Sequence, residues 1–207
     1  MHDMDVEAAS PLSRLWSGPP GPVFHALAAI PALVLLWAFS VPGFNLFEFG
    51  LATLFLLFAA AVWIVRGISY LVAVAHDRAH GNPAWFVLAP CAAMVVGLLV
   101  LLHVPTRVRW AASRHEFNVV AAHARPAGST ERWVSVEVPA HVGAYDIQRG
   151  YRAGHALILY EAHGDLFDDA GFAYLPDGPD PALANGSFEA PQYTRLGGDW
   201  YSWTASW

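Results

Sequence analysis

Three apolar stretches, each long enough to cross a lipid bilayer, lie between Val23 and Val104 of the chain. They run from about Val23 to Val41, from Leu46 to at least Val65, and from Trp85 to Val104. A hydrocarbon core about 30 Å thick requires about 20 apolar residues in helical form. Because lipid offers backbone groups no hydrogen-bond partner, such single segments can cross it only as helices. The sequence therefore predicts a three-helix transmembrane region over residues 23–104.

Composition divides the chain into three parts. Of the 207 residues 56% are hydrophobic, and the excess lies in the first half, whereas the second half has the mixed composition of a globular domain. We therefore expect a polar N-terminal tail (residues 1–22), the transmembrane region (23–104) and a polar domain (105–207). The predicted fold class is membrane α-helical, with three transmembrane helices, followed by a C-terminal α+β domain with a small antiparallel sheet.

Charges near the apolar stretches indicate that the first helix is retained. A cleaved signal peptide begins with a basic segment, but this chain begins with the acidic residues Asp3, Asp5 and Glu7.

Three spans place the polar domain on the side of the membrane opposite the N-terminal tail. Arginines flank both sides in equal number, so the positive-inside rule does not decide the orientation. Because a large folded domain can be translocated regardless of a few charges, we expect a multi-pass protein of the cell membrane with an extracytoplasmic polar domain.

Arg66 interrupts the second apolar stretch and allows two interpretations. In the first, the helix ends near Val65, and Arg66 extends its charge to the lipid headgroups. In the second, the helix continues to Ala75 and places Arg66 at membrane depth, where an ionisable side chain is costly and usually functional. Arg66 is therefore the candidate polar residue within the membrane.

In the polar domain, one helix is predicted before a series of short strands. Residues 106–124 contain no helix breaker, although their apolar side chains do not gather on one clean face. Alternation of apolar and polar residues then predicts five or six antiparallel strands, and Gly197-Gly198-Asp199 predicts a hairpin turn. The expected strands are Trp133–Val138, a strand around Tyr145 and Ile147, Ala156–Ala162, Phe172–Leu175, Tyr193–Leu196 and Trp200–Trp207. The aromatic row of Tyr201, Trp203 and Trp207 is expected in the core.

His76 and His80 form the first candidate metal site. Two histidines four residues apart share one face if they lie on a helix, and such a pair can chelate a metal ion. The string His76-Asp-Arg-Ala-His80-Gly resembles the first histidine box of membrane fatty-acid desaturases and hydroxylases. Those enzymes also need boxes with adjacent histidines, which this chain lacks. A polar loop between two spans is the alternative interpretation.

A second candidate metal site lies between Glu161 and Gly171. His163, Asp165, Asp168 and Asp169 place oxygen and nitrogen ligands in one short stretch. The spacing differs from that of an EF-hand loop, which has acids at alternate positions and Gly at the sixth. A solvated acidic turn is the alternative interpretation.

Other classes of function receive less support from the sequence. The formal net charge of −6 argues against nucleic-acid binding. The single cysteine, Cys91, lies within an apolar stretch, and no nucleophile elbow or phosphate-binding loop is present. We therefore expect no cofactor and a non-enzymatic accessory, docking or binding subunit, in contact with membrane lipid and a membrane-protein partner or larger complex. The alternative is a metal-dependent envelope enzyme or metal sensor that uses one of the His/Asp loops.

The C-terminal part also carries a family resemblance. Gly171-Phe-Ala-Tyr-Leu-Pro176, Leu196-Gly-Gly-Asp-Trp-Tyr-Ser-Trp203 and Ser206-Trp207 are the segments that carry it, together with Tyr145 in Val-Gly-Ala-Tyr. In these segments the chain resembles uncharacterised small integral membrane proteins of high-GC actinobacteria. All eleven basic residues are arginine, which is typical of a GC-rich genome. The resemblance implies a membrane protein but no particular activity and no site residues.

Overall fold

The computed structural model describes residues 18–43, 45–124, 133–163, 168–180 and 189–206. The chain forms two compact units. One comprises Met1–Leu33 and Leu51–Gly97, and the other comprises Val34–Gly50 and Leu98–Trp207. The second unit therefore contains the polar domain together with the segment that links the first two apolar stretches.

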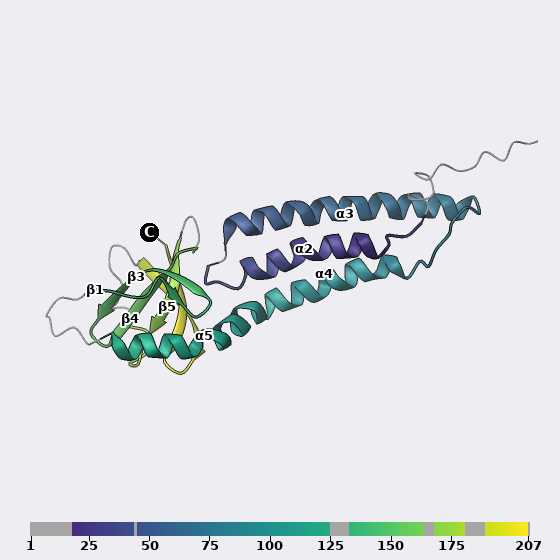
Figure 1. The fold of residues 1–207 in the computed structure, drawn as a ribbon. Helices are drawn as coiled ribbons and strands as arrows, with labels where there is room; N and C mark the ends of the chain where they lie inside the picture. Colours follow the sequence, from purple (N-terminus) through teal and green to yellow (C-terminus); the bar gives the residue numbers. More distant parts are fainter. Residues whose placement is uncertain (1–17, 44, 125–132, 164–167, 181–188, 207) are drawn as a thin grey trace, which may run out of the picture. The chain divides into compact units, whose positions relative to one another are not determined.

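Helices α2 (Pro22–Ala38), α3 (Leu46–Ala75) and α4 (Trp85–Leu101) coincide with the three apolar stretches. Within the first unit they lie side by side (Figure 1), and aromatic contacts join them. The rings of His25 and Trp85 stack with centroids 5.6 Å apart, and Phe86 meets Trp63 at 6.1 Å and Tyr70 at 5.3 Å. α3 continues without a break to Ala75, as in the second interpretation of Arg66.

The helices support the coarser part of the prediction, which is membrane association. Among the described helices, α3 alone is long and apolar enough to cross a membrane by itself. α4 passes the same test only together with α5 (Val104–His123), across the break between them, and α2 has only 17 residues. The core helix of a soluble protein is mostly buried, whereas only 6% of the apolar window of α3 is buried. α3 therefore supports membrane association, and three transmembrane helices stay a prediction.

An antiparallel sheet and one helix, α5, form most of the second unit. The strand order is β1-β3-β4-β5-β7-β6, and β2 pairs with β3. The strands are β1 (Val134–Val136), β2 (His141–Val142), β3 (Tyr145–Ala153), β4 (Ala156–Glu161), β5 (Asp168–Tyr174), β6 (Glu189–Gly197) and β7 (Trp200–Ser206). This arrangement confirms the predicted antiparallel sheet and the β6–β7 hairpin. The sequence did not predict β2, and β3 extends six residues beyond Ile147.

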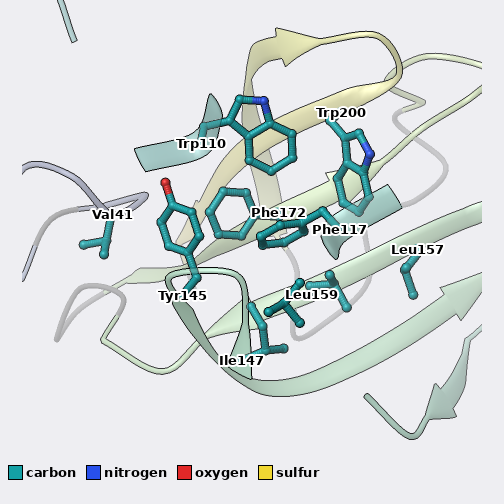
Figure 2. Close-up of a cluster of buried hydrophobic side chains, with 10 residues drawn as sticks. Val41, Trp110, Phe117, Tyr145, Ile147, Leu157, Leu159, Phe172 and Trp200 are labelled. Atoms are coloured by element: carbon teal, nitrogen blue, oxygen red, sulfur yellow. The ribbon is translucent and has the colours of Figure 1, made fainter. Parts of the chain in front are cut away.

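Two apolar clusters enclose the sheet, one on each face. On the face next to α5, five aromatic side chains gather (Figure 2): Trp110, Phe117, Tyr145, Phe172 and Trp200. The other face buries Ile158, Tyr160, Ala173, Trp203 and Ala205. Strand β4 is buried along its whole length because it contributes to both clusters. The predicted core position of Trp203 is confirmed, whereas Trp207 lies outside the described residues.

Ser113 explains why α5 shows no clean apolar face. Trp110, Ser113 and Phe117 are the buried residues of the helix, so a hydroxyl occupies the centre of the packed stripe. Its Oγ accepts a hydrogen bond from the Ala144 amide (2.9 Å) and donates one to the Arg109 carbonyl (3.0 Å). A Cβ on Gly143, where φ is +60°, would lie 2.3 Å from the Ser113 Cβ. The β2–β3 turn therefore packs directly against α5, and only glycine fits there.

At the other end of α5, Arg152 of β3 binds the last turn of the helix. This arginine is buried, and its Nη2 donates to the carbonyls of Ala121 (3.0 Å) and Ala124. Its Nη1 donates to the His155 carbonyl at 3.1 Å. Burial lowers the pKa of Arg152. A cation at a helix C-terminus satisfies carbonyls that have no intrahelical partner, and it interacts favourably with the helix dipole.

Strand β6 lies at one edge of the sheet and is irregular. Its register against β7 shifts between Glu189 and Gln192, and Pro191 lies within this interval. Proline has no amide hydrogen to donate, so it is tolerated at sheet edges and at bulges.

Replacing Phe117 tests the α5–sheet core. Phe117 is fully buried, and its ring meets those of Trp110, Tyr145, Phe172 and Trp200. We expect Phe117→Ala to lower the free energy of unfolding by about 3–5 kcal/mol, because it leaves a cavity among these rings. Phe58→Ala on α3 is the matched control, since Phe58 is 68% exposed and its loss is expected to cost less than about 0.5 kcal/mol. Thermal unfolding of the detergent-solubilised protein measures both, and equal destabilisation would contradict the proposed core.

Candidate functional site

Arg109 joins the end of α2 to the β2–β3 turn within the second unit. Its guanidinium carbon lies 4.3 Å from the ring centre of Trp37 and 4.4 Å from that of Tyr145. Nη1 donates to Ser40 Oγ at 2.8 Å, and Nε and Nη2 both donate to the Ala144 carbonyl. A guanidinium held by two aromatic rings and two acceptors is strongly restrained.

Two further hydrogen bonds hold the segment after α2. Thr106 Oγ1 donates to the Phe39 carbonyl at 2.8 Å, and the Tyr145 hydroxyl donates to the Ser40 carbonyl at 3.3 Å. Burial raises the pKa of Tyr145, although the charge of Arg109 opposes that shift. Tyr145 therefore stays neutral and donates its hydrogen bond. The segment after α2, which includes Phe39 and Ser40, is thereby held against the rest of the second unit.

Beside this segment lies an open groove with a volume of about 630 Å³. One side is formed by the segment after α2 and the first turns of α5, and the other by β6 and β7. Its lining residues are Phe39, Val41, Pro42, Gly43, His103, Thr106, Arg107, Trp110, Ala111, Arg114, Gln192, Thr194, Arg195, Leu196, Ser202, Trp203 and Thr204. We call this region the basic groove, because three arginines and a histidine line it and none of the described lining residues is acidic.

Two of these arginines approach the same turn. Arg195 donates from Nε and Nη2 to the Gly198 carbonyl, at 3.2 and 3.1 Å. Arg114 Nη2 lies 3.5 Å from the position that a Cβ on Gly198 would occupy. The guanidinium groups of Arg107 and Arg114 have no hydrogen-bond or ion-pair partner among the described residues. The groove therefore holds positive charge that the described part of the chain does not neutralise.

A carboxylate–imidazole cluster forms a second polar site in the same unit. Asp146 of β3 lies between two histidines: its Oδ1 is 2.5 Å from His141 Nδ1, and its Oδ2 is 3.6 Å from His163 Nδ1. His163 Nδ1 also lies 3.4 Å from Oε1 of Glu161, and the His163 amide donates to Glu161 Oε2 at 2.6 Å. The Glu161 side chain is fully buried.

The environment of Glu161 favours its neutral form. Burial raises its pKa, while the amide and imidazole of His163 and the charge of Arg109 act in the opposite direction. No group of three or more His, Cys, Asp or Glu within the described ranges has the geometry to hold a metal ion.

The predicted acidic loop is divided between two strands and a turn. Glu161 ends β4, and Asp168 and Asp169 begin β5. Asp169 pairs with Arg149 at 3.3 Å, whereas His163 contacts Glu161 and Asp146. Asp165 and the side chain of Asp168 lie outside the described residues, so a metal site with all four ligands stays a prediction.

His76 and His80 follow α3, which ends at Ala75, so they do not share a helical face. Both are exposed, and His76 Nδ1 lies 2.8 Å from the Val72 carbonyl. Metal binding by this pair stays a prediction, and the helical geometry that motivated it is not observed.

Arg66 binds the segment before α2. Its Nη2 donates to the carbonyls of Gly18 (3.2 Å) and Pro19 (3.0 Å). These residues lie three and four positions before Pro22, the first residue of α2, so Arg66 lies close to the start of that helix. If α2 crosses the bilayer, Arg66 is therefore near a membrane boundary and its charge is stabilised by carbonyl oxygens.

The residues that sequence reasoning missed come from separate segments. Asp146 and His141 flank the β2–β3 turn, and Arg195 lies far along the chain from Arg107 and Arg114. The alignment of Arg107 and Arg114, seven residues apart on the predicted helix, was the available signal for the groove. No signal in the sequence places Arg195 beside them.

Replacing Glu161 tests its ionisation. Burial raises the pKa of Glu161 above its ordinary value of 4.5. The neutral carboxyl group therefore contributes its full stability below pH 4.5, and this contribution is lost as the pH rises through the folded-state pKa. Glu161→Gln keeps an acceptor for the His163 amide and removes the charge. At pH 7.5 we therefore expect the melting temperature of the variant to exceed that of the wild type by about 2–4 °C. Near pH 4.5 we expect the two melting temperatures to be close.

The control for this measurement is Glu137→Gln, the same change at an exposed position after β1. It is expected to leave the melting temperature unchanged across the pH range. A lower melting temperature of Glu161→Gln at pH 7.5 would show that the charged form stabilises the fold.

Comparison with known proteins assigns no family: no protein-family model, curated protein or solved structure matches the chain. The basic groove and the carboxylate–imidazole cluster are therefore the features from which a function is inferred.

Proposed function

We propose that this chain is a multi-pass protein of the cell membrane that acts as a non-enzymatic docking or binding subunit. In this proposal α2, α3 and α4 each cross the bilayer, and the second unit faces the extracytoplasmic side. The basic groove is its binding surface, and a larger membrane complex is its partner. The resemblance to small membrane proteins of high-GC actinobacteria is compatible with this role.

The observation that carries the membrane part is the apolar surface of the three helices. Large side chains are exposed along all of them, including Val23 (71%) on α2, Phe58 on α3 and Met94 on α4. A helix that is apolar on every side is stable in a bilayer and unfavourable in water. At about 1.5 Å per residue, the 17 residues of α2 and of α4 each extend about 25 Å, which a locally thinned bilayer or the adjoining apolar residues can accommodate.

The binding role is supported by the construction of the groove. Arg109, Thr106 and Tyr145 hold the wall formed by the segment after α2, so that side of the groove is in place before any ligand arrives. A preformed site loses less conformational entropy on binding than a flexible one. Its volume falls within the range of ligand-binding clefts.

Cysteine labelling tests the three spans. Single cysteines at Gly21, Arg78 and Ser135, on a Cys91→Ala background, report on the start of α2, the α3–α4 connection and β1. The Gly21 position has room for a side chain, and Arg78 and Ser135 are exposed. In intact cells we expect a membrane-impermeant maleimide to label only the cysteine at Ser135, and all three after permeabilisation.

Each alternative arrangement gives a different labelling pattern. Labelling of Arg78→Cys together with Ser135→Cys would show that α4 does not cross the membrane. Labelling of Gly21→Cys and Ser135→Cys, without labelling of Arg78→Cys, would show that α2 does not cross the membrane. The inverse of the expected pattern would preserve three spans and overturn the extracytoplasmic position.

Affinity purification tests the docking role. The C-terminally tagged chain, extracted from its native membranes with a mild detergent, is expected to retain a defined membrane-protein partner in fixed ratio. Mass spectrometry of the eluate, compared with that from untagged membranes, identifies the partner. A stable, monomeric preparation without a stoichiometric partner would contradict the docking role.

A further inference from the structure

We propose that the basic groove binds the phosphate group of an anionic membrane lipid. This inference rests on the proposed membrane location and not on the identity of a protein partner. It assigns a ligand class to the groove from its charge, its hydrogen-bond donors and its position in the chain.

The charge comes from two elements that face each other across the groove. Arg107 and Arg114 lie seven residues apart on α5, which is about 10 Å along a helix, and Arg195 lies on β6. Guanidinium groups offer several donors in one plane and bind phosphate oxygens in a bidentate manner. Because the guanidinium groups of Arg107 and Arg114 have no partner among the described residues, their donors are available to a ligand.

Neutral donors complete the lining. Gln192 and Thr194 of β6 and Ser202 and Thr204 of β7 line the wall opposite α5, and Ser202 Oγ lies 3.4 Å from the Thr194 carbonyl. Hydroxyl and amide groups donate to the oxygens of a phosphodiester and of a polyol headgroup. Asp199 follows Gly198 directly in the β6–β7 turn but is not among the residues that line the groove.

The position of the lining residues favours a lipid over a soluble phosphate. Phe39–Gly43 directly follow α2, and His103–Arg107 directly follow α4. If these helices cross the bilayer, both segments lie within a few residues of the headgroup layer, where lipid phosphates are concentrated. Arginines close to a membrane surface attract anionic headgroups electrostatically. The rest of the chain carries a net negative charge, so the groove is a local exception.

Native mass spectrometry of the full-length protein tests this inference. The detergent-solubilised chain is offered phosphatidylglycerol and phosphatidylcholine with identical acyl chains at equal concentration. We expect the wild type to retain phosphatidylglycerol in preference. The double variant Arg107→Gln/Arg114→Gln is expected to lose at least about tenfold in phosphatidylglycerol affinity, since each arginine near a membrane surface contributes about fivefold.

A control variant removes the same charge elsewhere. Arg78→Gln/Arg149→Gln changes two arginines outside the groove, one exposed after α3 and one paired with Asp169 on β5. It is expected to retain the preference for phosphatidylglycerol. Equal losses in the two double variants would overturn the assignment of the lipid to the groove.

Two further outcomes separate the possible failures. Displacement of phosphatidylglycerol by millimolar inorganic phosphate, with loss of phosphate binding in Arg107→Gln/Arg114→Gln, would identify a soluble phosphate as the ligand and overturn the lipid assignment. Release of the wild type from native membranes by alkaline carbonate would overturn the membrane location itself. Retention in membranes without a preference for phosphatidylglycerol would overturn only the groove inference.

Discussion

The second unit depends on one half-buried cation, the guanidinium of Arg109. It packs against Trp37 and Tyr145 and donates to Ser40 and to the Ala144 carbonyl, so it connects the end of α2, helix α5 and the β2–β3 turn. Hydrogen bonds from a charged donor contribute about 1.5–3 kcal/mol each, and a partly desolvated cation–π contact adds about 1–2 kcal/mol. These contacts restrain the first turns of α5, and Arg152 restrains its last turn. Arg107 and Arg114 therefore face β6 and β7 from a helix that is restrained at both ends.

Much of the fold could be predicted from the sequence because apolar patterns report burial directly. Ala156–Ala162 is apolar on both faces, and β4 is indeed buried on both sides between the two clusters. α5 was predicted from the absence of breakers, but its packed face was not, because the central buried position holds Ser113. The Ser113 hydroxyl is buried because it forms hydrogen bonds with the backbone of Arg109 and Ala144. A hydropathy pattern scores serine as polar and therefore does not predict this buried position. β2 was missed because two residues are too few to show alternation.

The sites were less predictable because they assemble from distant segments. A run of acidic residues suggested one loop, but β-pairing directs Asp169 toward Arg149 and leaves His163 beside Glu161 and Asp146. Periodicity describes neighbours along the chain, whereas sheet register decides which side chains meet. The same holds for the groove, where Arg195 joins Arg114 only because the β6–β7 turn approaches α5. The spacing of residues predicts that Arg107 and Arg114 share one side of a helix, but it does not predict that Arg195 lies beside them.

The irregular edge of β6 limits how a protein partner can associate with this unit. Extended peptides often bind by adding a strand to a free sheet edge, a mode that requires a regular row of amide hydrogens and carbonyls. Pro191 has no amide hydrogen, and the register shift between Glu189 and Gln192 interrupts the regular pairing of the strand. The opposite edge, β1, offers only three residues. A partner of this unit would therefore be recognised through side chains and shape rather than through backbone pairing, and the same irregularity opposes edge-to-edge association between copies of the chain.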